Sequence, residues 1–206
     1  MRLRLFGTVV ELSYPLAAAV TAMLILDRSA SVFACLLAAL LHELGHIFAL
    51  KRFGAMPERI RLSLFDAAII DRKKLLRKNS REIIVVLAGV AANYVFAAAG
   101  TGLYLLVKNE WILTFASANL VLGLFNSLPV DSLDGGQALM MILTFFFSYK
   151  TAEAILLTVS VLILAPIACA GFLLLFYTRY NFTLLTAALY LVSVIFLRNK
   201  KRLLQK

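Results

Sequence analysis

Six long apolar segments constrain the fold of this 206-residue chain more than any other feature. Most of them approach the ~20 residues that an α-helix needs to cross the hydrocarbon core of a bilayer. Only 16% of the residues are charged, against about 25% in soluble domains, so a soluble surface could not be covered. The pattern predicts an all-α polytopic membrane protein with about six transmembrane helices, and it excludes a soluble α/β enzyme. The segments are Leu12–Leu26, Ala30–Leu50, Ile83–Val107, Trp111–Leu128, Ala154–Tyr177 and Phe182–Leu197.

The 21 lysine and arginine residues are distributed unevenly between the loops. If the N-terminus is inside, the outer loops carry only Arg28, Lys108 and Arg179, which leaves 18 for the inner segments. This bias follows the positive-inside rule and predicts that both termini are cytoplasmic. Because the basic residues fall between apolar runs, the net charge of +10 indicates loops beside a lipid bilayer rather than binding of nucleic acid.

Two shorter regions lie between the predicted spans. Polar and apolar residues alternate over 59–64, and this period of two predicts a strand at the membrane surface, with 65–70 as its turn and return strand. The 13-residue apolar stretch Gln137–Tyr149 is too short to span a bilayer, so we expect an interfacial or a re-entrant helix. The fold class therefore includes a short membrane-surface β-hairpin between the second and third spans, in a single domain over residues 1–206.

The two histidines of the chain stand in the sequence His42-Glu43-Leu44-Gly45-His46. On a helix, residues i and i+4 project from one face. This is the HExxH arrangement, in which two imidazoles hold Zn²⁺ and the glutamate acts as general base. The alternatives are a chance match and a structural polar pair within the bundle, but neither needs this spacing.

The predicted depth of the two histidines in the membrane indicates that they have a function. If Lys51 marks the cytoplasmic end of the second span, His46 lies about 7 Å and His42 about 13 Å below that edge, at 1.5 Å per residue. A charged side chain at the bilayer centre costs at least ~2.5–3.5 kcal/mol, and intramembrane ionisable groups are functional by default. Metal coordination offsets such a cost.

A catalytic zinc site needs a third protein ligand, and no histidine remains to supply it. The second and fourth spans run in the same direction, so their C-terminal ends meet at the same cytoplasmic depth. This parity favours Asp131 or Asp134, which follow the fourth span, over Asp27, Glu110 or Glu11. Asp66 is disfavoured because it lies in the basic surface loop and not at the depth of the histidines. Pro129 and the Gly135-Gly136 pair would allow irregular backbone there, although an ordinary turn would suit the same residues.

An HELGH sequence in an early span, followed later by an NxxPxxxxDGG segment, resembles the site-2 protease family of intramembrane zinc metalloproteases. The compact form without a PDZ insertion is similar to the bacterial sporulation branch, which processes the membrane-tethered pro-sigma-K factor. The resemblance implies regulated intramembrane proteolysis in a bacterial cell membrane. The expected partners are a membrane-embedded or membrane-tethered protein substrate and regulatory membrane proteins. We expect neither a PDZ domain nor the nucleotide-sensing domain that some sporulation members carry.

Carried over by motif position, the resemblance makes His42, His46 and Asp134 the ligands of one Zn²⁺ per chain and Glu43 the catalytic base. Asn126 and Pro129 would line the substrate site. The stretch 88–93 is similar to the small-residue motif of the family's third span, with Val90 where proline is common.

The expected activity is that of a metalloendopeptidase. An extended substrate could pair with the 59–64 strand, and Phe65 could gate the site or anchor the loop in the membrane. The two alternatives are a membrane metal-ion transporter and a catalytically silent membrane scaffold. A transporter would need further ligands along a path, and a scaffold has no need of Glu43. The variant Glu43→Gln discriminates, because a protease should keep zinc and lose hydrolysis.

Overall fold

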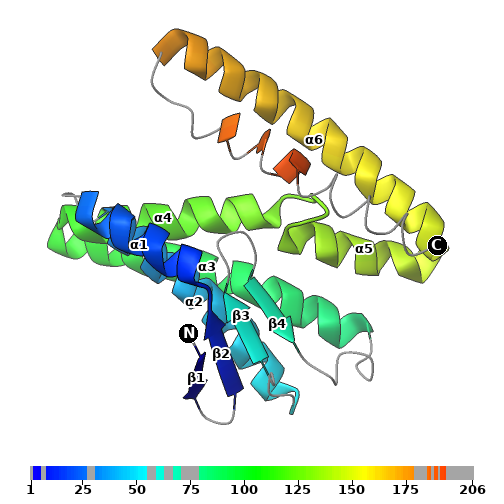
Figure 1. The fold of residues 1–206 in the computed structure, drawn as a ribbon, viewed down its shortest axis with the longest axis horizontal. Coiled ribbons are helices and arrows are strands. Elements are labelled where there is room, and N and C mark those ends of the chain that lie inside the picture. The colour runs from blue at the N-terminus through cyan, green and yellow to red at the C-terminus, as the bar shows by residue number, and fades with distance from the viewer. Residues whose placement is uncertain are drawn as a thin grey trace. The chain divides into compact units, whose positions relative to one another are not determined.

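The structure is a computed structural model that describes residues 2–5, 8–26, 31–54, 59–62, 67–70 and 79–178, with short helical pieces at 185–186, 188–189 and 191–193. The chain forms two compact units, Met1–Phe125 and Asn126–Lys206. Figure 1 shows the helices and strands of which each unit is made.

Two long helices, α2 (Ser31–Arg52) and α3 (Asn79–Val107), form the centre of the first unit. They cover the second and third predicted apolar segments. Small residues line their contact: a Cβ added at Gly45 would lie 2.6 Å from the carbonyl oxygen of Ala88 and 2.9 Å from Cβ of Ala92. The backbones of the two helices therefore approach as closely as small-residue stripes allow in membrane helices.

The next helix, α4 (Glu110–Ser127), covers the fourth predicted segment and packs against α3. The rings of Phe96 and Phe115 lie edge to face with their centroids 6.4 Å apart. A Cβ added at Gly100 would lie 3.0 Å from Cβ of Ala116, so this contact also depends on small residues. Side chains of α2, α3 and α4 can therefore meet within the first unit.

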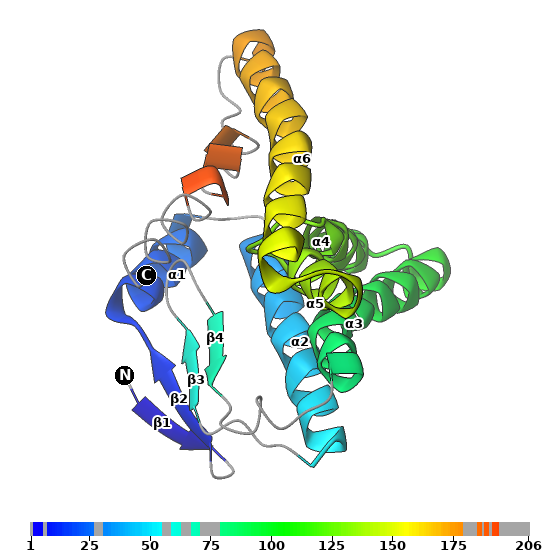
Figure 2. The ribbon, with the colours of Figure 1, turned by 90° about the vertical axis from the view of Figure 1, so that its right-hand side faces the viewer.

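The first unit also holds a four-stranded sheet in the order β1-β2-β3-β4 (Figure 2). The central pair, β2 with β3, is parallel, with Val9 opposite Arg59, and both outer pairs are antiparallel. The expected strand and return strand over 59–70 correspond to β3 and β4. The strands are β1 (Arg2–Leu5), β2 (Thr8–Leu12), β3 (Arg59–Leu62) and β4 (Ala67–Ile70).

This sheet corrects two expectations. The all-α fold class with one hairpin did not include β1 and β2. These two strands form a hairpin with each other, and β2 also pairs with β3, a strand far along the chain that no local pattern marks as its partner. The proposed pairing of a substrate with the 59–64 strand is wrong for β3, because both of its edges are already bonded to β2 and β4. Phe65 and Asp66 lie outside the described residues.

The second unit contains an irregular turn and two helices, α5 (Asp134–Phe146) and α6 (Tyr149–Thr178), which pack together. The hydroxyl of Ser160 on α6 ties the turn to that helix. It accepts the backbone N–H of Asp131 at 3.0 Å and donates to the carbonyl oxygen of Leu156 at 2.8 Å. The expected short helix after Gln137 is part of α5, and its position in the membrane stays a prediction.

Among the described residues, three helices are long and apolar enough to cross a membrane: α2, α3 and α6. Three of the six predicted spans therefore correspond to helices that are long and apolar enough to cross a membrane. The first, α1 (Tyr14–Leu26), has 13 residues, and α4 has 18 residues interrupted by polar side chains. The predicted segment Phe182–Leu197 lies largely outside the described residues. The single domain over 1–206 stays a prediction.

Candidate metal centre

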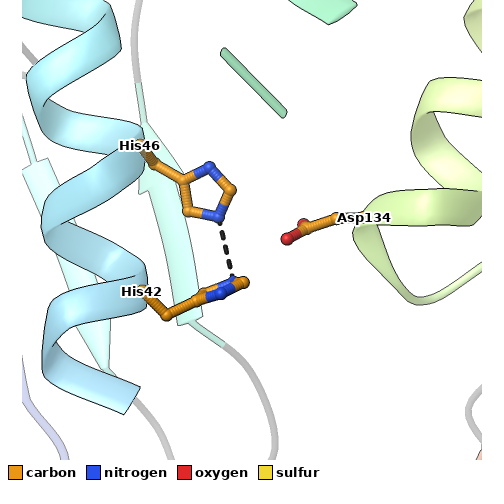
Figure 3. Close-up of side chains that lie close together, drawn as sticks. All are labelled: His42, His46 and Asp134. Atoms are coloured by element: carbon orange, nitrogen blue, oxygen red, sulfur yellow. Dashed lines mark hydrogen bonds between the residues drawn. The ribbon is translucent and has the colours of Figure 1, made fainter. Parts of the chain in front are cut away.

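His42 and His46 lie one turn apart on α2, and their side chains are only 6% and 8% exposed. Their rings are almost perpendicular, at 87°, with centroids 4.8 Å apart. The two Nε2 atoms approach to 3.1 Å (Figure 3). The spacing of the motif along the helix therefore brings one nitrogen of each ring to the same point.

The other nitrogen of each ring is held by an oxygen of α3. Nδ1 of His46 lies 2.8 Å from the backbone oxygen of Val85, and Nδ1 of His42 lies 2.6 Å from Oδ1 of Asn93. Carbonyl oxygens only accept hydrogen bonds, so both Nδ1 atoms carry the proton. An uncharged imidazole has one N–H, and each ring thus presents the lone pair of Nε2. This is the tautomer that binds a metal, with the opposite nitrogen held by a supporting acceptor.

The distance between the two Nε2 atoms fits a shared cation. The two Nε2 atoms lie 3.1 Å apart, within hydrogen-bond distance in the absence of a metal. Tetrahedral Zn²⁺ with Zn–N bonds of about 2.05 Å would hold its two nitrogens about 3.3 Å apart. The histidine pair therefore fits a zinc ion with little movement.

Gly89 on α3 provides the space in front of the two rings. A Cβ at this position would clash with Nε2 of His46 and would lie 2.7 Å from Cε1 of His46 and 2.8 Å from Cε1 of His42. Residues 88–93 are the stretch that resembles the family's small-residue motif. At Gly89 a small residue is needed because the two imidazole rings leave no room for a Cβ. A side chain here would push the two rings out of their positions.

Asp134 is the first residue of α5 in the second unit, and its side chain is half-buried. The two glycines that follow let the backbone pack tightly. A Cβ at Gly135 would clash with the backbone oxygen of Ser127, and one at Gly136 with the oxygen of Val130. Neither glycine adopts a positive φ, so close approach, rather than the expected irregular backbone, explains the pair.

His42, His46 and Asp134 offer two imidazole nitrogens and one carboxylate oxygen, a donor set that could hold a metal ion. Glu43 is half-buried on α2, beside His42 in the chain. Asn126 lies in the last turn of α4, which ends at Ser127, and Pro129 lies in the turn that follows; both are half-buried. The roles of Glu43, Asn126 and Pro129 stay predictions.

The sequence did not assign roles to two buried amides of this region, Asn93 on α3 and Asn119 on α4. One sequence feature could have drawn attention to them, because each is a polar residue within a predicted apolar span. An isolated asparagine has no spacing that connects it with a motif elsewhere, and only the packing of the three helices relates it to the histidines.

The chain is similar to known proteins both in sequence and in structure. Over 126 residues the chain is 29% identical to zinc metalloprotease MJ0392 of Methanocaldococcus jannaschii, a match that covers 56% of this chain and 34% of that relative. The chain thus matches about a third of the length of this curated relative. No protein-family model matches.

The second similarity is structural. The solved structure of the site-2 protease from Methanocaldococcus jannaschii matches with a TM-score of 0.63 and 22% identity, over 93% of this chain and 91% of that one. The chain therefore shares the fold of a site-2 protease.

Proposed function

We propose that this protein is an intramembrane zinc metalloprotease of the site-2 protease family. The observation that carries the proposal is the histidine pair: two buried rings on an apolar helix, each with Nδ1 next to an oxygen of α3 and with the two Nε2 atoms 3.1 Å apart. The fold of a site-2 protease and the partial match to a zinc metalloprotease support the same activity.

One Zn²⁺ per chain would be held by His42, His46 and Asp134. Two neutral imidazoles and one carboxylate are a ligand set of catalytic zinc sites, which keep a fourth position open. Span parity favours Asp131 or Asp134, and the resemblance to the family motif selects Asp134. Its position at the start of α5 gives it a defined backbone.

Zinc held by His42, His46 and Asp134 would supply a Lewis acid for the scissile carbonyl group and for a water molecule. Glu43 would act as general base toward the attacking water and then as general acid toward the leaving amine. Asn126 orients the backbone of the substrate with its side-chain amide, and Pro129 shapes the turn beside it. The Nδ1 bonds of His42 and His46 keep both rings oriented throughout the reaction.

The site would open to the cytoplasm. The N-terminal strands and the 59–70 strands belong to one sheet, so they lie on the same side of any membrane that α2 crosses. The positive-inside rule makes that side cytoplasmic, together with both termini. Reporter fusions at Lys78 and Gln205 should both report the cytoplasm, and opposite locations would overturn the orientation.

The substrate would be a membrane-embedded or membrane-tethered protein, cut near its cytoplasmic end and controlled by regulatory membrane proteins. The sporulation pro-sigma-K factor is a candidate that rests on the sequence resemblance alone. Co-expression with tethered transcription factors, read out as a shortened product, would identify the substrate.

The variant Glu43→Gln tests the activity. The purified full chain should keep its zinc, and cleavage of a membrane-tethered substrate should fall at least ~100-fold, because the general base is lost. Glu110→Gln, an exposed acidic residue at the start of α4, is the matched control and should cleave at the wild-type rate. Undiminished cleavage by Glu43→Gln, or zinc flux into vesicles that Glu43→Gln leaves intact, would contradict the proposal and favour a transporter.

A further inference from the structure

We propose that Asn93 is a positioning residue that fixes His42 in the tautomer able to bind metal through Nε2. The proposal rests on the proposed function, since it assigns Asn93 a role toward the same metal. It is carried by a chain of hydrogen bonds that connects α2, α3 and α4 inside the first unit.

Asn93 is fully buried and uses both ends of its side-chain amide. Its Oδ1 lies 2.6 Å from Nδ1 of His42. Its Nδ2 lies 3.2 Å from the backbone oxygen of Ala38 and 3.0 Å from Oδ1 of Asn119. A buried amide in an apolar helix is costly unless it is hydrogen-bonded, and Asn93 meets that condition by bonding to two other helices.

Backbone carbonyl groups determine which way this amide points. The oxygen of Ala38 can only accept, so the nitrogen of Asn93 faces it and the oxygen of Asn93 faces His42. Asn119, also fully buried, donates from Nδ2 to the backbone oxygen of Phe115 at 2.9 Å, so its own oxygen faces Asn93. Acceptors on α2 and α4 thus give the chain of bonds a single direction.

This direction requires Nδ1 of His42 to donate, which leaves the lone pair of that ring on Nε2. His46 reaches the same tautomer by donating to the backbone oxygen of Val85. The two histidines differ in one respect: the acceptor of His42 is a side chain and can be removed by mutation, whereas that of His46 cannot. His46 is therefore an internal control.

The experiment reads the tautomers directly in the full chain, purified in detergent and free of metal. The sequence has only two histidines, so imidazole ¹⁵N labelling gives signals from two rings. In Asn93→Leu, His42 should lose its Nδ1–H signal and shift to the Nε2–H tautomer, while His46 keeps its Nδ1–H signal. Zinc affinity, measured by competition with a chromophoric chelator, should fall about 10–100-fold.

Two further variants separate positioning from helix packing. Asn93→Asp keeps an acceptor for His42 and loses both donors, so His42 should keep Nδ1–H, and zinc should bind at least ~10-fold more tightly than in Asn93→Leu. Asn119→Leu leaves the bond between Asn93 and Ala38, so it should change neither tautomer. If Asn93→Leu does not fold, Asn93→Asp alone tests the proposal. His42 with its Nδ1–H signal supports it, and loss of that signal contradicts it.

The inference is overturned if His42 keeps Nδ1–H in Asn93→Leu, or if Asn93→Asp loses zinc as completely as Asn93→Leu does. In either case Asn93 would only hold the helices together. The tautomers are measured without metal, so this test is independent of the proposed function. The proposed function would instead be contradicted by a wild-type chain that binds no zinc.

Discussion

The histidine half and the aspartate half of the proposed metal centre are held by different physical means. His42 and His46 lie on a regular helix, and directional hydrogen bonds to α3 orient their rings. Asp134 begins a short helix after an irregular turn, and its backbone is placed by tight packing at Gly135 and Gly136. The position of the histidines thus depends on the hydrogen-bond acceptors that α3 provides. The position of Asp134 depends on the absence of a side chain at Gly135 and Gly136.

The two halves share one requirement, since both need glycine where another helix or turn approaches. At Gly89 the neighbours are the two imidazole rings, and at Gly136 they are backbone atoms. A ring can rotate away from an added methyl group and lose its orientation, whereas a backbone cannot move without unpacking the turn. We therefore expect a substitution in the first half to affect metal binding and one in the second half to affect stability as well.

The largest effect is expected for Gly89→Ala. The added Cβ would clash with Nε2 of His46, so the ring must leave its position, and zinc affinity should fall about 100-fold. Gly102→Ala on the same helix is the control, because a Cβ there meets no atom within 4 Å. Chelator competition on both variants measures the difference. Equal zinc affinity in the two would show that Gly89 does not make room for the metal.

A smaller effect is expected for Gly136→Ala. The new Cβ would clash with the backbone oxygen of Val130, and such overpacking typically costs about 1–3 kcal/mol. The melting temperature of the purified chain should fall, and zinc should bind more weakly because Asp134 shifts with the start of α5. If Gly136→Ala melted at the same temperature as the control Gly102→Ala, the turn would accommodate the methyl group without loss of stability. Close packing would then not determine the position of Asp134.

The smallest effect is expected for Ser160→Ala on α6. The substitution removes the acceptor of the Asp131 N–H, a buried hydrogen bond worth about 1 kcal/mol. Thr158→Ala on the same helix is the control, because its hydroxyl is exposed and bonds only locally to Ala154. Ser160→Ala should melt at a lower temperature than Thr158→Ala, while zinc affinity stays close to that of wild type. A large loss of zinc in Ser160→Ala would place Ser160 closer to the chemistry than this account does.

The helical half of the centre could be predicted from the sequence because its information is local. The i, i+4 spacing of His42 and His46 holds on any α-helix, and the apolar runs around them mark the helices. The boundaries of α2 and α3 lie close to the segments read from hydropathy. Gly45, between the two histidines, has no side chain, and α3 lies against it.

The remaining features could not be predicted because they depend on contacts between distant segments. The bond between His42 and Asn93 joins residues 51 positions apart, and β2 pairs with a strand from the loop after α2. Composition was also misleading at Gly135 and Gly136, where glycine suggests unusual dihedral angles. The neighbours that explain this pair are backbone atoms of the preceding turn, and only the fold shows them.

The central claim is that His42, His46 and a carboxylate hold one zinc ion per chain. X-ray absorption of the purified full chain at the zinc edge, together with elemental analysis, tests it most directly. The account predicts about one zinc per chain with two imidazole nitrogens and oxygen ligands at about 2.0–2.2 Å, and loss of the ion in His46→Ala. A chain with less than about a tenth of one zinc after metal loading, or a spectrum with sulfur scattering at about 2.3 Å, would contradict it.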